Sequence, residues 1–359
     1  MKKWVKRIVL IIVALLVIIG AYMIYVFQAY YRLPDNLTLE VTRNGENSYF
    51  EDDKPLETKT PYWIMTYNIG FGAYRPDYSF FMDGGKSSWG KDAESVTAAV
   101  CGIGEIINTV NPEFVLLQEI DVDGTRSYHI NEVELMNQFL KGYYYNYAQN
   151  YDAPFLMVPP WQPHGTNKAG LATYSRVEIM DSMRRSLPVS ENIVKLTDLD
   201  RCYSISRIPM TNGKTLCIYN VHLTAFSGGE NIREAQLATL FENMKQEYAQ
   251  GNYVICGGDY NHNLKKDGDT NVPEWAAPFP RESLPEGFRL AIDAFANQND
   301  IAHNSCRNAN MPYQEGVTFT VTVDGFIVSD NVNVNFYQNM DWRYEFSDHD
   351  PVLMEFMLE

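Results

Sequence analysis

Cysteine and positive charge are both scarce in this chain of 359 residues. The five cysteines are widely scattered, with no Cys-x-x-Cys pair and no histidine at zinc-finger spacing, so the sequence indicates neither a zinc module nor a disulfide framework. Lysine and arginine total 29 against 45 acidic residues, which gives a formal net charge of −16. Proteins that hold duplex nucleic acid without sequence preference neutralise its phosphates with lysine and arginine. The composition therefore argues against tight non-specific duplex binding, but not against a nuclease with a local basic groove.

One long apolar run covers Ile8–Phe27. Its 20 residues, at a helical rise of roughly 1.5 Å each, would cover about 30 Å, the thickness of the hydrocarbon layer of a bilayer. Four basic residues precede it, Lys2, Lys3, Lys6 and Arg7, and positive charges beside a span tend to stay in the cytoplasm. We therefore expect a single-pass helix in the cell membrane, with the rest of the chain outside the cytoplasm.

A cleaved signal peptide is the main alternative explanation of this run, and a buried core helix is another. Signal peptides also begin with basic residues, but their apolar stretch is shorter and ends at a small-x-small cleavage site. Here the run ends in Tyr-Met-Ile-Tyr-Val-Phe-Gln-Ala-Tyr-Tyr, which offers no such site, and no cysteine follows it for lipid attachment. A retained anchor is the favoured prediction, which makes the membrane the first predicted partner.

The pattern of composition divides the chain into three parts. Residues 1–32 form the basic tip and the membrane anchor, and residues 33–60 are polar and turn-rich, as expected of a stalk that adds an edge strand. Residues 61–359 are expected to form one catalytic domain, because 45% of the chain is hydrophobic and can bury a large core. The first 32 residues carry five basic and no acidic side chains, so the remainder has a net charge near −21.

Many short strands and a few helices are predicted for the large domain. The predicted strands are Tyr62–Asn68, Glu113–Glu119, Lys168–Tyr174, Tyr203–Met210, Thr215–Leu223, Asn252–Gly258, Thr318–Ser329 and Val352–Leu358. The predicted helices are Ala93–Val110, Ile130–Leu140 and Asn231–Ala249. Strands in the second half return without helical crossovers, which favours a layered α/β sandwich over a doubly wound parallel sheet. Two stretches, Gly72–Lys91 and Gln149–Asn167, are predicted to be long functional loops.

Six short motifs place a polar side chain at the end of an apolar run. They are Thr66-Tyr67-Asn68, Leu117-Gln118-Glu119, Asn220-Val221-His222-Leu223, Gly258-Asp259-Tyr260-Asn261, Val323-Asp324-Gly325-Phe326-Ile327 and Ser347-Asp348-His349-Asp350-Pro351-Val352. A side chain in that position reaches from the rim of a sheet into a cleft. Taken singly, each motif has a simpler explanation, such as a solvated strand end or a core histidine. Their combination indicates one site.

The residue types in these motifs suit phosphoester hydrolysis. That chemistry needs a hard cation held by oxygen atoms, a base for water, and donors for the charge that develops on phosphate. Glu119 and Asn68 offer a carboxylate and an amide oxygen for Mg²⁺. His349 suits proton transfer near neutral pH, and Asp324 could fix its tautomer through the other ring nitrogen.

Three further residues suit the water and the phosphate. Asp259 could orient the attacking water, and His222 and Asn261 could donate to phosphate oxygens. Three other histidines have no second ligand at helical spacing and are predicted to be surface or loop residues. They are His164, His262 and His303.

In this order, over residues 62–358, the six segments resemble the endonuclease/exonuclease/phosphatase superfamily. Its members include DNase I-like nucleases, inositol polyphosphate 5-phosphatases and bacterial neutral sphingomyelinases. The matching blocks are N-I-G, Q-E, N-x-H-L, G-D-[YF]-N, D-[GYH]-[IF] and S-D-H-x-P-V. The resemblance implies a four-layer α-β-β-α sandwich, here preceded by one transmembrane helix. The aromatic insertion Phe71–Gly85 departs from the family pattern, and we expect it to lie beside the cleft.

The resemblance also implies roles for individual residues. Mg²⁺, or Mn²⁺ in its place, is expected near Asn68 and Glu119, with Asp348 reaching the ion directly or through water. Arg126 resembles a family arginine that faces the cleft, and its guanidinium is the candidate phosphate clamp. The implied catalytic residues are Asp324 paired with His349, Asp259 and Asn261 at the attacking water, and His222 on the scissile phosphate.

Three functions remain open at this point. The favoured one is a membrane-anchored phosphodiesterase or phosphatase that acts outside the cytoplasm on a small or lipid head-group phosphoester. The second is a membrane-bound DNA or RNA endonuclease or exonuclease, which the acidic composition disfavours. The third is a non-catalytic binding domain on the same fold. Every chemical position is filled by a competent residue, so the sequence favours an enzyme.

Overall fold

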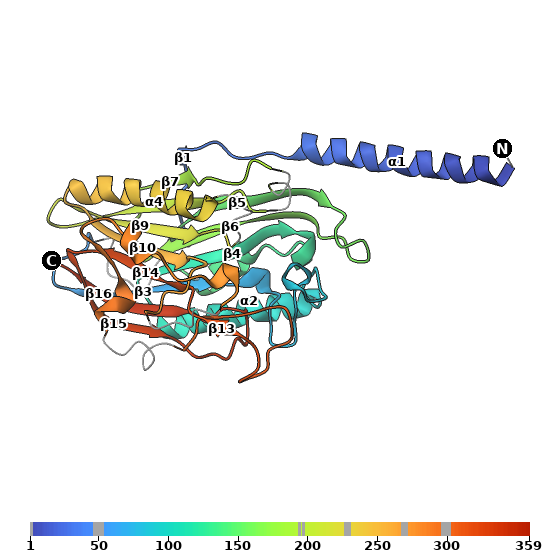
Figure 1. The fold of residues 1–359 in the computed structure, drawn as a ribbon. Coiled ribbons are helices and arrows are strands. Elements are labelled where there is room, and N and C mark those ends of the chain that lie inside the picture. The colour runs from blue at the N-terminus through green and yellow to red at the C-terminus, as the bar shows by residue number, and fades with distance from the viewer. Residues whose placement is uncertain are drawn as a thin grey trace.

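Two large sheets packed face to face make up the body of the protein in this computed structural model (Figure 1). The structure describes residues 3–45, 54–192, 195, 198–225, 231–266, 272–295 and 303–359. The first sheet has the order β1 (Leu37–Thr38), β7 (Asp181–Ser186), β8 (Cys202–Pro209), β9 (Thr215–His222), β10 (Tyr253–Asp259), β14 (Asp324–Ser329) and β11 (Phe288–Leu290). The second has the order β15 (Val332–Asn339), β16 (Val352–Leu358), β3 (Pro61–Asn68), β4 (Phe114–Gly124), β6 (Gly165–Ser175), β5 (Tyr144–Leu156) and β2 (Thr42–Arg43).

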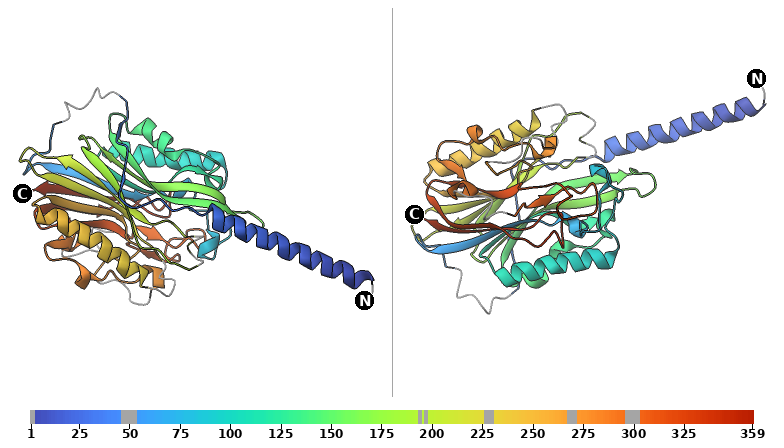
Figure 2. Two further views of the ribbon diagram at one scale, coloured as in Figure 1. Left: turned by 90° about the horizontal axis from the view of Figure 1, so that it is seen from above. Right: turned by 60° about the horizontal axis from the view of Figure 1, so that its bottom comes forward.

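Helices cover the outer faces of both sheets. Helix α4 (Ile232–Ala249) lies over the first sheet, and α2 (Ala93–Val110) and α3 (Glu132–Phe139) lie over the second (Figures 1 and 2). The predicted four-layer α-β-β-α sandwich is therefore confirmed. A two-stranded ribbon, β12 (Cys306–Arg307) and β13 (Thr320–Val321), and the 3-10 turns η1 (Gly70–Gly72), η2 (Phe81–Asp83), η3 (Thr125–Ser127), η5 (Glu274–Ala276), η6 (Arg281–Ser283) and η7 (Ala291–Ala294) complete the described elements.

The central strands are apolar on both faces because both faces are buried. In β3, Ile64 packs into the core between the sheets, and the next residue, Met65, packs under α2 beside Ile103. In β4, Leu116 packs into the core between the sheets, and Leu117 packs into the core under α2. This alternation explains why these strands read as continuous hydrophobic runs in the sequence.

Most predicted boundaries agree with the structure, because capping residues and apolar runs mark them clearly. Helix α2 has the predicted bounds: the Asp92 carboxylate accepts from the amide of Ser95 at its start, and Asn111 adopts the left-handed conformation just beyond its end. Strand β16 also has the predicted bounds. The predicted run Thr318–Ser329 is instead divided into β13 and β14.

The prediction that Gln149–Asn167 forms an irregular loop was wrong. Strand β5 continues to Leu156 and β6 begins at Gly165, so most of this stretch forms the end of a long hairpin. Its asparagines and glutamine give the appearance of a loop, but Asn167, for example, is buried and bonded within the fold. Nδ2 of Asn167 donates to the carbonyl of His164 at 3.0 Å, and its Oδ1 accepts from the amide of Arg126 at 3.1 Å. Strands β7 and β15 were also missed, whereas Gly72–Lys91 is irregular apart from η2, as predicted.

The segment after the N-terminal helix adds one short edge strand to each sheet. Strand β1 pairs with β7 in the first sheet, and β2 pairs with β5 in the second. The sequence predicted a stalk or edge segment over residues 33–60, of which residues 46–53 lie outside the described part of the chain. Pairing with both sheets means that this segment crosses one side of the sandwich, which fixes where the preceding helix leaves the domain.

Helix α1 (Lys3–Ala29) projects away from the sandwich (Figures 1 and 2). It is 27 residues long, its most apolar window has a mean hydropathy of 3.0, and none of that window is buried. By length and composition it could cross a membrane. Its C-terminal end lies beside the β5–β6 hairpin, where the hydroxyl of Tyr22 accepts from the amide of Met157 at 2.9 Å.

Candidate active site

Three predicted site residues lie side by side at the ends of neighbouring strands. Asp259, the last residue of β10, is paired with His222 of the parallel strand β9 and with Asp324 of the antiparallel strand β14. This close approach requires a glycine before Asp259. A Cβ on Gly258 would lie 2.0 Å from the carbonyl oxygen of Val221, and φ of this residue is +147°.

The second sheet brings Asn68 and Glu119 to the same end of the sandwich. Asn68 ends β3, and its register partner on the parallel strand β4 is Gln118. Strand β4 has a bulge there, because Gln118 and Glu119 together oppose a single residue, Leu171, of β6. The bulge places Glu119 at φ +51°, a left-handed conformation that costs a non-glycine residue on the order of 1 kcal/mol. The strain turns the carboxylate towards the cleft.

A loop before β16 supplies the last motif. The hydroxyl of Ser347 donates to the carbonyl of Asn68 at 2.8 Å and accepts from the amide of His349 at 3.2 Å. These two bonds tie the loop to the end of β3. His349 also forms an isolated bridge with Cys306 of β12. Asp348 and His349 are thereby placed against residues that lie more than 200 positions earlier in the chain.

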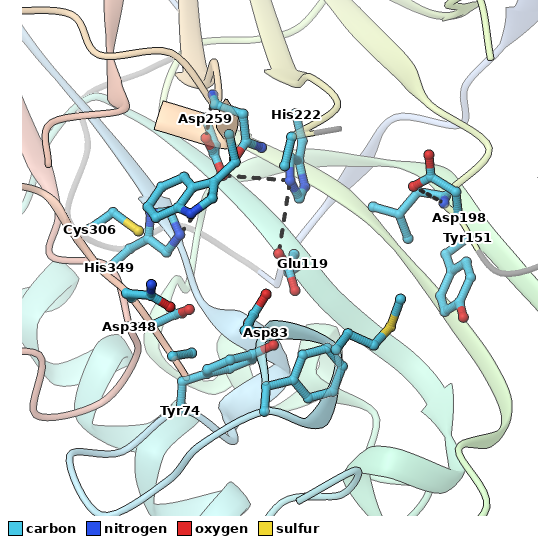
Figure 3. Close-up of a pocket in the computed structure, with 18 of the residues that line it drawn as sticks. Tyr74, Asp83, Glu119, Tyr151, Asp198, His222, Asp259, Cys306, Asp348 and His349 are labelled. Atoms are coloured by element: carbon cyan, nitrogen blue, oxygen red, sulfur yellow. Dashed lines mark hydrogen bonds and ion pairs between the residues drawn. The ribbon is translucent and has the colours of Figure 1, made fainter. Parts of the chain in front are cut away.

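The six motifs meet in one polar network, and Figure 3 shows the part of it that Glu119, His222 and Asp259 form. Nδ2 of Asn68 donates to Oε1 of Glu119 at 3.2 Å and to Oδ2 of Asp259 at 3.1 Å, and its Oδ1 accepts from the amide of Gly70. Nε2 of His222 lies 3.5 Å from Oδ2 of Asp259 and 3.9 Å from Oε1 of Glu119. Asp259 and Glu119 thus share two neighbours, one from each sheet.

His349 and Asp324 form a short buried pair, with Nδ1 of His349 2.7 Å from Oδ2 of Asp324. The hydroxyl of Ser305 donates to the same oxygen at 2.6 Å. Burial alone would lower the pKa of His349, but the Asp324 carboxylate raises it well above its ordinary value. His222 differs, since burial and nearby positive charges hold its pKa well below the ordinary value. The arrangement therefore separates a protonated histidine from a neutral one.

Three carboxylates, those of Glu119, Asp348 and Asp83, also line the cavity (Figure 3). Burial, reinforced by Glu119, raises the pKa of Asp348 to about 6, although His349 and Arg307 oppose the rise. Asp83, from η2, was not predicted. The Asp83 side chain is exposed to solvent. Its pKa is raised first by desolvation and then by the negative charges of Asp348 and Glu119. Contact with water partly screens this rise. These influences show that the three acids lie near one another.

These carboxylates fit a divalent cation. Uncompensated acids with raised pKa values are stabilised by a nearby positive ion, and oxygen ligands suit Mg²⁺ or Mn²⁺. Glu119 and Asp348 offer carboxylate oxygens, whereas Asn68 turns its nitrogen towards Glu119 and would ligate only after its amide turns over. A second group, Asp259, Asp324 and His349, has ligand atoms within 4.8 Å of one another, but the hydrogen bond between His349 and Asp324 already satisfies two of them.

The predicted phosphate clamp, Arg126, lines the cavity but is largely engaged. Its Nε and Nη2 bind the two oxygens of Asp121 at 3.1 and 2.7 Å, and its guanidinium carbon lies 3.9 Å from the ring centroid of Phe71. In the described part of the chain only Nη1 remains without a partner. Sequence reasoning missed two further arginines of the cavity, Arg201 and Arg307.

The cavity formed by these residues has a volume of about 270 Å³. Seven of the nine predicted site residues line it: Glu119, Arg126, His222, Asp259, Asn261, Asp348 and His349. The other two, Asn68 and Asp324, are fully buried behind it and act on the residues in front of them. The aromatic insertion contributes Tyr74 and Phe80 to the wall, so the expectation that it lies beside the cleft is confirmed. Nδ2 of Asn261 donates to the carbonyl of Leu223 at 2.8 Å.

The predictions for the remaining histidines need correction. His164 and His262 lie in loops but are buried, not on the surface. His164 lines the cavity, with Nδ1 3.0 Å from Oγ of Ser88, and burial lowers its pKa to about 3. His303 does have acidic neighbours, because Nε2 lies 3.4 Å from Asp350 and 3.6 Å from Asp341. These contacts come from distant segments, so local spacing could not reveal them.

Comparisons with known proteins agree with this geometry. The sequence model of the family described as the Endonuclease/Exonuclease/phosphatase family matches residues 65–349. No curated protein gives a significant match. A D. rerio TDP2 complexed with single-strand DNA product is 15% identical, with a TM-score of 0.55 over 83% of this chain and 99% of that chain. The human Nocturnin catalytic domain with bound sulfate is 18% identical, with a TM-score of 0.52 over 89% and 97%. An endonuclease/exonuclease/phosphatase from Bacteroides vulgatus is 16% identical, with a TM-score of 0.54 over 84% and 100%. At these identities the solved structures show a shared fold alone.

Proposed function

The chain belongs to the endonuclease/exonuclease/phosphatase family, and from this premise we propose that it is a membrane-anchored, metal-dependent phosphoester hydrolase that acts outside the cytoplasm. Its proposed substrate is a small or lipid head-group phosphoester. The observation that carries the proposal is the meeting of all six motifs at one cavity, with the buried His349–Asp324 pair and the three acids Glu119, Asp348 and Asp83. That arrangement offers groups for proton transfer and groups for cation binding.

Glu119 and Asp348 are the proposed metal ligands, with Asn68 as a third once its amide oxygen faces the ion. Mg²⁺ is the proposed ion, with Mn²⁺ as the alternative. When bound, the ion would supply positive charge to the phosphate oxygens and polarise the phosphorus centre. Asp83 stands beside the same acids and extends the negative cluster towards solvent.

The proton transfers are assigned to Asp259 and His349. Asp259 accepts a proton from the attacking water as the water oxygen bonds to phosphorus, and Asn261 beside it positions that water. His349, held protonated by Asp324, gives its Nε2 proton to the leaving oxygen as the phosphorus–oxygen bond breaks. Neutral His222 donates to a phosphate oxygen through Nε2, the ring nitrogen that lies 3.5 Å from Oδ2 of Asp259.

The composition of the cavity supports a small or lipid head group. Aromatic side chains such as Tyr74, Phe80 and Trp275 line it, and these suit the alkyl and sugar parts of a head group. The chain outside α1 is strongly acidic, which disfavours a long polyanion such as DNA. The apolar helix α1 supports the anchor, and the basic residues before it support an external catalytic domain.

Hydrolysis of bis-p-nitrophenyl phosphate by the full chain in detergent tests this function. We expect Mg²⁺-dependent turnover that EDTA abolishes and that His349→Ala reduces at least about a hundredfold. Plasmid DNA is assayed in parallel with the same preparation. Nicking that falls steeply with salt would favour the nuclease instead. Absence of metal-dependent turnover on every substrate would leave the non-catalytic binding domain.

A further inference from the structure

Four large apolar side chains are exposed together at the end of the β5–β6 hairpin. Phe155, Met157, Val158 and Trp161 are 40%, 50%, 54% and 74% exposed. They fall within seven consecutive positions, and we call these four residues the apolar tip. Scattered single apolar residues are normal on a protein surface, but a contiguous group usually marks a contact site.

Two residues of the apolar tip, Phe155 and Met157, contact the C-terminal part of α1. The hydroxyl of Tyr22 accepts from the amide of Met157 at 2.9 Å and donates to the carbonyl of Phe155 at 3.2 Å. The hydroxyl of Tyr25 accepts from the amide of Phe155 at 3.2 Å. The tip is therefore fixed at the level of the last turns of the helix.

That level falls within the outer edge of a membrane that α1 crosses. Tyr22 lies five residues before Phe27, the end of the apolar run, which is about 7.5 Å along a helix axis. A surface segment that binds a bilayer through apolar side chains typically enters it to roughly 5–10 Å. Tyrosine is also a common residue at this depth, because its ring is apolar and its hydroxyl is polar.

The apolar tip is also close in sequence to the cavity wall. The loop that carries it continues to His164, which lines the cavity wall. That loop is joined to the aromatic insertion, since the amide of Ser88 donates to Gln162 at 2.9 Å and Nε1 of Trp89 donates to the carbonyl of Pro163 at 2.7 Å. Met82 of the insertion is 50% exposed and also lines the cavity. The loop that carries the apolar tip is thus joined to the cavity wall, which has an exposed apolar side chain of its own.

We propose that the apolar tip inserts into the outer leaflet and holds the cavity mouth at the bilayer surface, so that the substrate is the phosphoester head group of a membrane lipid. The proposal rests on the proposed function and narrows its substrate class. An acidic domain gains little from attraction to anionic lipids, so apolar contact is the interaction available to hold it down. The continuity of the tip with the apolar helix identifies the bilayer as its occupant.

Fluorescence quenching in vesicles tests the insertion directly. Met157→Cys and Met180→Cys are made in a Cys101→Ala background, labelled with an environment-sensitive fluorophore, and reconstituted as full chains into phosphatidylcholine vesicles containing doxyl lipids. Met180 is the matched control, because it is also 50% exposed but follows β6 at the opposite end of the strand from the tip. We expect a blue shift and loss of most fluorescence at position 157 only. Equal quenching at the two positions would overturn the proposal.

Activity on two substrates tests the consequence. Met157→Glu and Trp161→Glu should each reduce release of soluble head groups from vesicles by about tenfold, with bis-p-nitrophenyl phosphate hydrolysis unchanged. Met180→Glu should change neither activity. Head-group release that survives both tip substitutions would overturn the proposal.

The two experiments also separate failure of this inference from failure of the proposed function. If the chain hydrolyses the soluble substrate but position 157 is not quenched, the function stands and the tip proposal fails. If position 157 is quenched but no metal-dependent hydrolysis occurs on either substrate, the membrane contact stands and the proposed function fails, together with the lipid substrate.

Discussion

The contact between His349 and Asp324 provides the sharpest test of the proposed chemistry. Oδ2 of Asp324 lies 2.7 Å from Nδ1 of His349, and both side chains are buried. A hydrogen bond between charged partners contributes about 1.5–3 kcal/mol, and about 1.4 kcal/mol corresponds to a factor of ten in rate. We therefore expect Asp324→Asn, which keeps the shape but removes the charge, to lower kcat by about 10- to 150-fold while KM stays within about threefold.

The assay is Mg²⁺-dependent hydrolysis of bis-p-nitrophenyl phosphate by the full chain, with thermal unfolding of every variant. Asp123→Asn is the matched control, because Asp123 lies 2.6 Å from Nδ1 of His129 but both side chains are exposed. Water screens such a pair, so kcat should not change. If Asp324→Asn does not fold, His349→Gln replaces it. Equal kcat values for folded Asp324→Asn and Asp123→Asn would refute the reasoning.

Three further substitutions test the metal site, the strand packing and a buried histidine. Glu119→Gln should raise the Mg²⁺ concentration for half-maximal activity by at least about tenfold in a Mg²⁺ titration; an unchanged value would remove Glu119 from the site. Gly258→Ala places a Cβ 2.0 Å from the carbonyl oxygen of Val221 and should lower the free energy of urea unfolding by roughly 3 kcal/mol or more; unchanged stability would contradict this. Burial, followed by the charge of Arg126, lowers the pKa of His164 from 6.5 to about 3. As the pH falls, His164 is therefore protonated in the unfolded chain before it is protonated in the folded protein, and stability is lost from pH 6.5 towards pH 3. Between pH 7 and pH 5, His164→Asn should lose about 2 kcal/mol less stability than the unsubstituted protein; equal losses would refute the assignment.

Strand ends were predictable because each central strand carries its own signal in the sequence. Asn68, His222 and Asp259 each follow a largely apolar run, and a polar residue in that position must leave the sheet or reach a cleft. The packing of both faces of β3 and β4 keeps these runs long and unambiguous. Neither the bulge at Glu119 nor its left-handed backbone could be predicted, because both depend on the register with β6.

The outer strands were less predictable because their polar residues pair only after folding. Strand β5 contains asparagine, glutamine and aspartate at spacings typical of a loop, yet Asn146 is buried and bonded to Ser206 of the other sheet. Asp83 was missed for a related reason. It lies in an irregular aromatic insertion, and only the fold brings it beside Glu119 and Asp348. Local periodicity carries no information about such contacts.

The three cavity arginines differ in how much of their charge is left for a substrate. Asp121 binds Arg126 through two hydrogen bonds, and Asp198 lies 3.3 Å from Nη2 of Arg201. In the described part of the chain, the hydrogen bonds of Arg307 all go to backbone carbonyls, including that of Tyr74 at 3.0 Å. Carbonyls orient a guanidinium without cancelling its charge.

It follows that Arg307, more than the predicted Arg126, is placed to supply uncompensated positive charge in the cavity. It already lowers the pKa of Asp348 and of Asp83, so its field reaches the acids that are the proposed metal ligands and their neighbour. A phosphate held there would meet Arg307 on one side and the cation on the other. Because its guanidinium is fixed by the carbonyl of Tyr74 in the aromatic insertion, that insertion would help to orient the phosphate of the proposed substrate, and it also shapes the cavity wall.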